Sequence, residues 1–170
     1  MPAQSLLSHA LEHELNDQES RATAIVSANT LLEILLEDAV RDLLEREGAS
    51  SELSAWMAGE VGAINGRLNI VKQMLGTTVG DIAAELGLGW FMDDWAQLRR
   101  MRSDAVHQGN LYSFPSDLQQ RLERTTLAGV QIFAEVHNRT WMAAESGDLG
   151  PPSVFLHVLV PESGPPESPH

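Results

Sequence analysis

The stretch from Leu31 to Leu44, LLEILLEDAVRDLL, decides the fold. Its apolar residues recur every three or four positions with charged residues between them, which is the period of an amphipathic α-helix. The same spacing extends from about Leu6 to Glu47. A polar run at 16–20 either divides this segment into a short and a long helix or forms a solvated face of one helix. The sequence therefore predicts a long helix early in the chain.

Further helical segments follow with turn signals between them. The expected helices cover residues 53–75, 78–86, 90–107 and 118 to about 144. Three glycines, Gly59, Gly62 and Gly66, weaken the first of these by about 1 kcal/mol each, or they let another backbone approach closely. We expect an all-α protein, a bundle of four or five antiparallel helices over residues 1–146.

Composition limits the functional classes. The 170 residues suit one domain, a hydrophobic content of 43% is typical of a globular protein, and the absence of cysteine excludes disulfides and thiol chemistry. No secretory leader or membrane span is evident, so we expect a cytoplasmic protein without a membrane partner. Residues 147–170 form a Pro/Gly-rich C-terminal extension, in which the apolar run Ser153–Val160 favours an extended conformation.

The formal net charge is −13, yet three of the eleven basic residues lie within four positions. The segment 98–109 reads LRRMRSDAVHQG and contains Arg99, Arg100 and Arg102, with His107 five residues after the last arginine. An acidic protein is a poor general binder of nucleic acid, because such binding normally depends on a basic surface. Any polyanion would therefore have to bind at this local patch.

On a regular helix, residues 102 and 107 are about 140° apart around the axis. Arg102 then lies at the margin of an apolar face, whereas Arg100, Asp104 and His107 share the opposite side. The apolar face consists of Phe91, Trp95, Leu98, Met101 and Ala105. A charge at an apolar margin needs a partner, and a second subunit could supply it.

The arginines and the histidine of this segment also have a purely structural explanation. Arg99 and Arg100 can be solvated and pair with Asp93, Asp94 or Asp104. His107 can be a helix-end residue, because a cation in the last turn interacts favourably with the helix dipole.

The segment 98–109 resembles the signature of the HEPN superfamily, in which Arg-x4–6-His lies near the end of a core helix and glycine often follows. The leucine- and glutamate-rich segment Leu31–Glu37 and the apolar helix after the motif also resemble that layout, over about residues 20 to 145. The resemblance implies a homodimeric, metal-independent endoribonuclease of the toxin or defence type, with no cofactor. It also implies RNA as substrate and admits an antitoxin or regulatory protein as partner.

In that interpretation His107 is the general base or acid and Arg102 binds the phosphate. Ser103 and Asp104 would orient the histidine or bind RNA, and Arg99 and Arg100 would guide the RNA backbone. The alternative is a HEPN-like regulator or adaptor and dimerisation module without catalysis. Ser103, which replaces the asparagine of many members, and the acidic composition favour this alternative.

Two other sequence patterns are weaker indications of a functional site. His9-Ala10-Leu11-Glu12-His13 fits an inverted zinc-protease motif, but no downstream carboxylate ligand is marked, so we expect no metal site. The tryptophans are expected in the core or in interfaces, since the few other aromatic residues do not make a base-stacking surface. They are Trp56, Trp90, Trp95 and Trp141.

Overall fold

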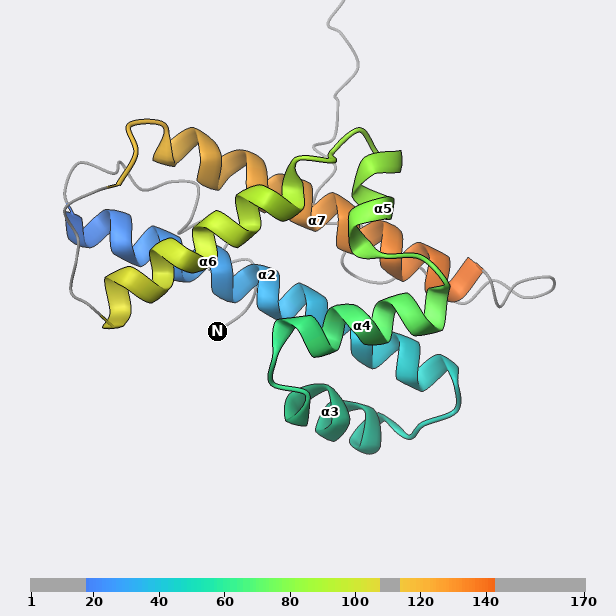
Figure 1. The fold of residues 1–170 in the computed structure, drawn as a ribbon. Coiled ribbons are helices and arrows are strands. Elements are labelled where there is room, and N and C mark those ends of the chain that lie inside the picture. The colour runs from blue at the N-terminus through green and yellow to red at the C-terminus, as the bar shows by residue number, and fades with distance from the viewer. Residues whose placement is uncertain (1–17, 108–113, 143–170) are drawn as a thin grey trace, which may run out of the picture.

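The computed structural model describes residues 18–107 and 114–142, and this part of the chain contains helices and no strand (Figure 1). The prediction of an all-α protein is confirmed. The helices are α2 (Gln18–Arg46), α3 (Ser51–Glu60), α4 (Ile64–Leu75), α5 (Val79–Glu85), α6 (Phe91–His107) and α7 (Leu118–Met142). The HxxEH pattern at 9–13, residues 108–113 with Gly109, and the extension at 147–170 lie outside the described residues.

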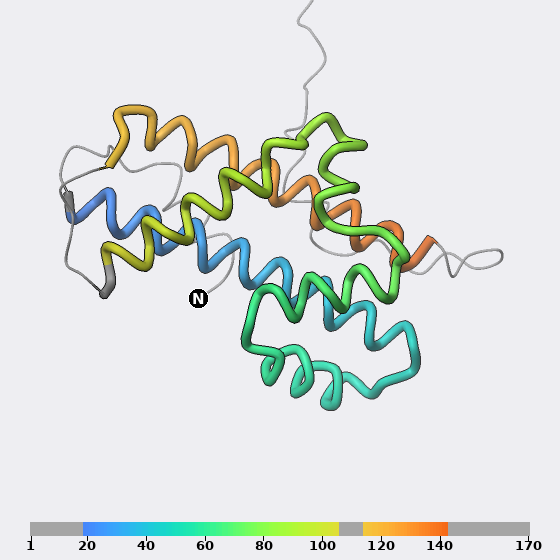
Figure 2. The backbone as a smooth tube through the Cα atoms, in the orientation of Figure 1, coloured from blue at the N-terminus to red at the C-terminus, as the bar shows by residue number. Residues whose placement is uncertain are grey.

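Helix α2 is the centre of the bundle and contacts α3, α4, α6 and α7. Figure 2 shows α6 returning along α2 in the opposite direction, and α7 then running back across both. Helices α3 and α4 lie against the C-terminal half of α2, whereas α5 packs mainly against α7 (Figure 1). The helix predicted from the stretch 31–44 thus supplies the surface on which the other long helices pack.

The core comprises two groups of buried apolar side chains. The larger group surrounds an aromatic trio of Phe91, Trp95 and Phe133, whose ring centroids are 5.6 to 6.5 Å apart. The smaller group joins Ile25 of α2 to Leu98 of α6 at the other end of the bundle. Both groups contain buried side chains of α6. The helix that carries the Arg–His motif is therefore packed against the core at both places.

Gly129 lets α7 approach α2 closely. A Cβ atom at this position would lie 2.1 Å from Cδ2 of Leu32 and 3.4 Å from Cε2 of Phe91. At this crossing of the two longest helices, a side chain at position 129 would therefore force the buried Leu32 side chain to move.

The single helix predicted for 53–75 is wrong, because the structure divides this segment into α3 and α4. The break lies at Val61, Gly62 and Ala63, where Val61 leaves helical geometry with ψ at 64°. The Val61 side chain folds over Gly66, whose missing Cβ would be 2.7 Å from Cγ1 of Val61. Gly66 thus permits the close approach of Val61 at this corner and does not merely weaken a continuous helix.

Helix α3 is fixed to the bundle by Arg67 of α4. The Nε of Arg67 donates a hydrogen bond to the Ala58 carbonyl at 3.1 Å, and Nη2 lies 2.8 Å from the Glu37 carboxylate of α2. Arg67 is 7% exposed whereas the Glu37 side chain is 41% exposed, so the guanidinium end of this three-helix link is buried and its carboxylate end is open to solvent.

The turn expected between the helical segments 53–75 and 78–86 is confirmed, and Thr78 is the N-cap of α5. The Thr78 hydroxyl accepts from the Asp81 N–H at 3.0 Å, and the Asp81 carboxylate accepts from the Thr78 N–H at 3.1 Å. Gly87, with φ of 75°, follows the helix, as expected for a C-terminal stop.

Candidate functional site

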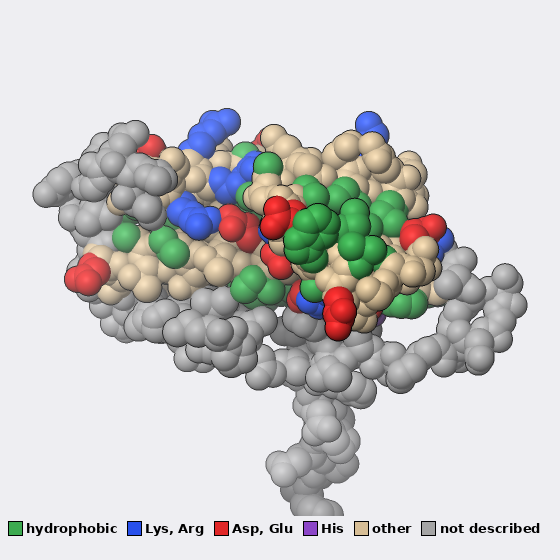
Figure 3. Space-filling model, turned by 90° about the horizontal axis from the view of Figure 1, so that it is seen from below, with side chains coloured by type: hydrophobic (Ala, Val, Ile, Leu, Met, Phe, Trp, Pro, Cys, Tyr) green, Lys and Arg blue, Asp and Glu red, His purple; other side chains and the backbone are tan. Residues whose placement is uncertain are grey.

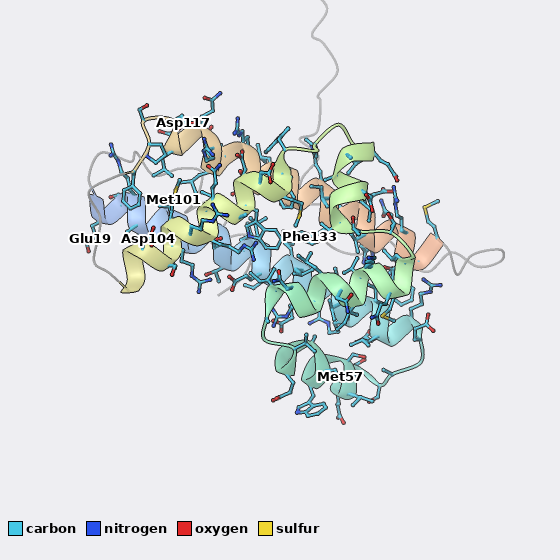
Figure 4. The ribbon with its side chains drawn as sticks, viewed as in Figure 1. Glu19, Met57, Met101, Asp104, Asp117 and Phe133 are labelled. Carbon is cyan, nitrogen blue, oxygen red and sulfur yellow. The ribbon has the colours of Figure 1, made fainter. Side chains whose placement is uncertain are left out.

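The Arg–His motif lies on α6, which is anchored by its apolar face. Phe91, Trp95 and Leu98 are fully buried, and Met101 and Ala105 are half-buried. This is the apolar face predicted from the sequence. Figure 4 shows Met101 and Asp104 near the C-terminal end of α6, at the same end of the bundle as Glu19 of α2.

Arg102 lies at the margin of that face and pairs with Glu33 of α2. The distance from Arg102 Nη1 to Glu33 Oε1 is 2.5 Å, and the two side chains are 37% and 27% exposed. The partner expected for this charge is therefore present in the same chain and does not require a second subunit. A guanidinium has five N–H donors, and the bond to Glu33 uses one of them.

The backbone of α6 is helical from Phe91 to His107, so the motif lies on a continuous helix. Positions 102 and 107 are therefore separated by about 140° around the helix axis. The side chain of His107 lies outside the described part of the structure. The helical backbone of one chain does not place Arg102 and position 107 on the same face.

Arg99 and Arg100 differ in their surroundings. The Arg99 guanidinium lies over the Trp95 ring, 5.4 Å from its centroid, and its Nε is buried without a hydrogen-bond partner among the described residues. Arg100 is exposed, as are Ser103 and Asp104. Arg100 is thus the more accessible cation for a polyanion, whereas Arg99 is partly occupied by its aromatic contact.

Of the three aspartates that the structural explanation offered to Arg99 and Arg100, Asp94 pairs elsewhere, because its carboxylate faces α7. Its side chain is 8% exposed, and its two carboxylate oxygens lie 3.2 Å from Arg121 Nη1 and 2.5 Å from Arg124 Nη2. Sequence reasoning missed this cluster. The spacing of Asp94 could have predicted it, because Asp94 is three residues after Phe91 and four before Leu98 and so lies on the buried side of the helix.

The arginines of this cluster have further contacts. Arg121 also donates to Gln97 and lies 3.1 Å from the Asp117 carboxylate, and this hydrogen bond holds the pKa of Asp117 below its usual value of 3.8. Arg124 lies over the exposed Trp90, 5.0 Å from the ring centroid. Both arginines join α6 to α7, so they are structural cations.

Trp95 is a core residue as expected, while Trp56, Trp90 and Trp141 are exposed. Within residues 18–107 and 114–142, no cluster of three His, Asp or Glu side chains is arranged to hold a metal ion. In the same ranges no helix is both long and apolar enough to cross a membrane. No protein family model, no curated protein and no solved structure matches the chain.

Proposed function

We propose that the chain is a HEPN-like, metal-independent endoribonuclease of the toxin or defence type. In this proposal two copies associate so that Arg102 and His107 of each line one cleft. The supporting observation is the position of Arg102, which is partly exposed and held by Glu33 at the edge of α6. A guanidinium fixed in this way can direct its remaining donors at a phosphate group.

The proposed reaction is attack of the RNA 2′-hydroxyl on the adjacent phosphorus. An imidazole of His107 takes the 2′-hydroxyl proton, the new P–O2′ bond forms and the P–O5′ bond breaks. The leaving 5′-oxygen receives a proton from an acid, which the second copy of His107 can supply. Arg102 stabilises the negative charge that builds on the phosphate, and the products are a 2′,3′-cyclic phosphate and a 5′-hydroxyl.

The remaining residues of the patch have auxiliary roles in this proposal. Ser103 and Asp104, both exposed on α6, orient the histidine or bind RNA. Arg100, the exposed cation, guides the RNA backbone more directly than Arg99, which lies against Trp95.

The test is cleavage of single-stranded RNA in the presence of EDTA. The wild-type protein is expected to cleave, and His107→Ala and Arg102→Ala are each expected to be slower by about 10²-fold or more. Arg46→Ala, which also removes an arginine from a helix, is the matched control and is expected to cleave as the wild type does. No cleavage by the wild type, or equal cleavage by His107→Ala, would contradict the proposal.

The second candidate is a HEPN-like regulator or adaptor and dimerisation module without catalysis. The pairing of Arg102 with Glu33 favours it, because an adjacent carboxylate offsets the charge that a phosphate would need. The net charge of −13 also favours this candidate, because it disfavours binding of RNA. This candidate predicts a dimer that leaves RNA intact, and the cleavage assay together with a mass measurement separates the two.

A further inference from the structure

Helix α3 presents its large apolar side chains to solvent and its small ones to the bundle. The buried residues of this helix are Ser54 and Ala58. Trp56, by contrast, is 61% exposed and Leu53 is 46% exposed. A helix that served only to cover the core would have the opposite arrangement, because burial of large apolar side chains stabilises the fold.

The exposed apolar residues of α3 form one surface. Leu53 and Trp56 are three residues apart and therefore adjacent on the helix, and the half-buried Met57 is four residues after Leu53. Figure 3, which views the molecule from the side of α3, shows hydrophobic side chains gathered there with acidic side chains around them. We call Leu53, Trp56 and Met57 the α3 surface.

Contacts within the chain hold the α3 surface in position. Arg67 links the Ala58 carbonyl of α3 to Glu37 of α2, and Ser50 caps the start of the helix by accepting from the Leu53 N–H at 3.2 Å. A fixed helix loses little conformational entropy on binding. Tryptophan is also among the residue types that contribute most to protein interfaces.

The charges beside the surface identify the chemistry of the partner. Glu52, Trp56 and Glu60 are spaced four residues apart, so an exposed carboxylate lies one turn before and one turn after the indole. Helix α3 contains no lysine or arginine, and Glu60 stands in the last turn, where the helix dipole disfavours an acidic residue. The placement of Glu60 is thus not explained by the stability of the helix.

We propose that the α3 surface binds an amphipathic segment of a protein partner, apolar on one side and flanked by lysine or arginine. A second copy of this chain would oppose Glu52 and Glu60 with the same carboxylates, and an anionic membrane would be repelled by them. The proposal is independent of the Arg–His motif, since the residues proposed to contact the partner all belong to α3 and none to α6.

The test uses two labelled helical peptides with the same leucine face, one flanked by lysines and the other by glutamates. Fluorescence anisotropy with the full chain is expected to show binding of the lysine peptide and none of the glutamate peptide. Trp56→Ser is expected to weaken binding by about tenfold or more, and the pair Glu52→Gln and Glu60→Gln by several-fold. Trp141→Ser removes another exposed tryptophan, from α7, and is the matched control, expected to bind as the wild type does.

Three results would overturn the proposal. The first is failure of the lysine peptide to bind the wild-type chain. The second is equal binding by Trp56→Ser, which keeps the net charge and so reveals purely electrostatic attraction. The third is a wild-type dimer that Trp56→Ser converts to a monomer, because this would assign the surface to a second copy. Circular dichroism of Trp56→Ser checks that the helices are retained.

Discussion

Arg102 of α6 and Glu33 of α2 form an ion pair, with 2.5 Å between Nη1 and Oε1. The pair joins residues 69 positions apart in the sequence and lies at the edge of the bundle. Because both side chains are partly exposed, water screens the attraction, and the pair contributes more to the orientation of the guanidinium than to stability.

A double-mutant cycle measures this contribution. Glu33→Gln, Arg102→Gln and the combined variant are compared with the wild type by urea unfolding. We expect a coupling energy of roughly 0.2–1 kcal/mol, as for other partly exposed ion pairs. A coupling of several kcal/mol would mean that Arg102 is a structural residue, which would count against a role in binding phosphate.

Gly129→Ala is expected to destabilise the protein. The added Cβ would overlap Leu32, whose Cδ2 would be 2.1 Å away. Overpacking of this kind costs about 1–3 kcal/mol, measurable by urea unfolding. Gly59→Ala is the matched control, because nothing lies within 4 Å of its Cβ position. The control is expected to be neutral or to stabilise α3 by up to about 1 kcal/mol, and equal effects of the two variants would contradict this helix packing.

Asp94→Asn is expected to lower the free energy of unfolding by about 1–3 kcal/mol. The substitution leaves Arg121, whose side chain is 17% exposed, without its buried carboxylate partner. Asp93→Asn, one residue earlier and exposed, makes the same chemical change without this loss. Thermal unfolding of the two variants at pH 7 is the measurement. A fall in melting temperature for Asp93→Asn as large as that for Asp94→Asn would show that the cluster does not join α6 to α7.

Stability is expected to depend on pH through Asp81. Hydrogen bonds from the Thr78 hydroxyl and backbone N–H lower the pKa of this carboxyl below its usual 3.8. A lowered pKa means that the contribution is present above pH 3.8 and is lost as the pH falls through the pKa of the folded state. The difference in melting temperature between the wild type and Asp81→Asn should therefore be larger at pH 7 than at pH 3. A difference that grows on acidification would contradict the capping geometry.

Sequence periodicity predicted the all-α fold and the apolar face of α6, because buried leucines and aromatic residues repeat with the helical period. It failed at Val61–Ala63, since periodicity continues through a corner that depends on Val61 packing over Gly66. Periodicity also did not predict that Trp56 is exposed. The buried residues of α3 are the small Ser54 and Ala58.

The motif itself could be located from sequence, but the neighbours of its residues could not. Glu33 is 69 residues from Arg102, and Asp94 is 27 and 30 residues from its arginines. Such pairings depend on how α2, α6 and α7 cross. Local spacing contains no information on these crossings, so it offered only the nearby Asp93, Asp94 and Asp104 as partners for Arg99 and Arg100.

The proposed activity is cleavage of RNA through its own 2′-hydroxyl, and an oligodeoxynucleotide that contains one ribonucleotide tests it most directly. After incubation with the wild-type protein in EDTA, the proposal predicts a single cut after that ribose, with a 2′,3′-cyclic phosphate on one product and a 5′-hydroxyl on the other. An uncut strand, a cut elsewhere in the DNA, or a product with a free 3′-hydroxyl would contradict it.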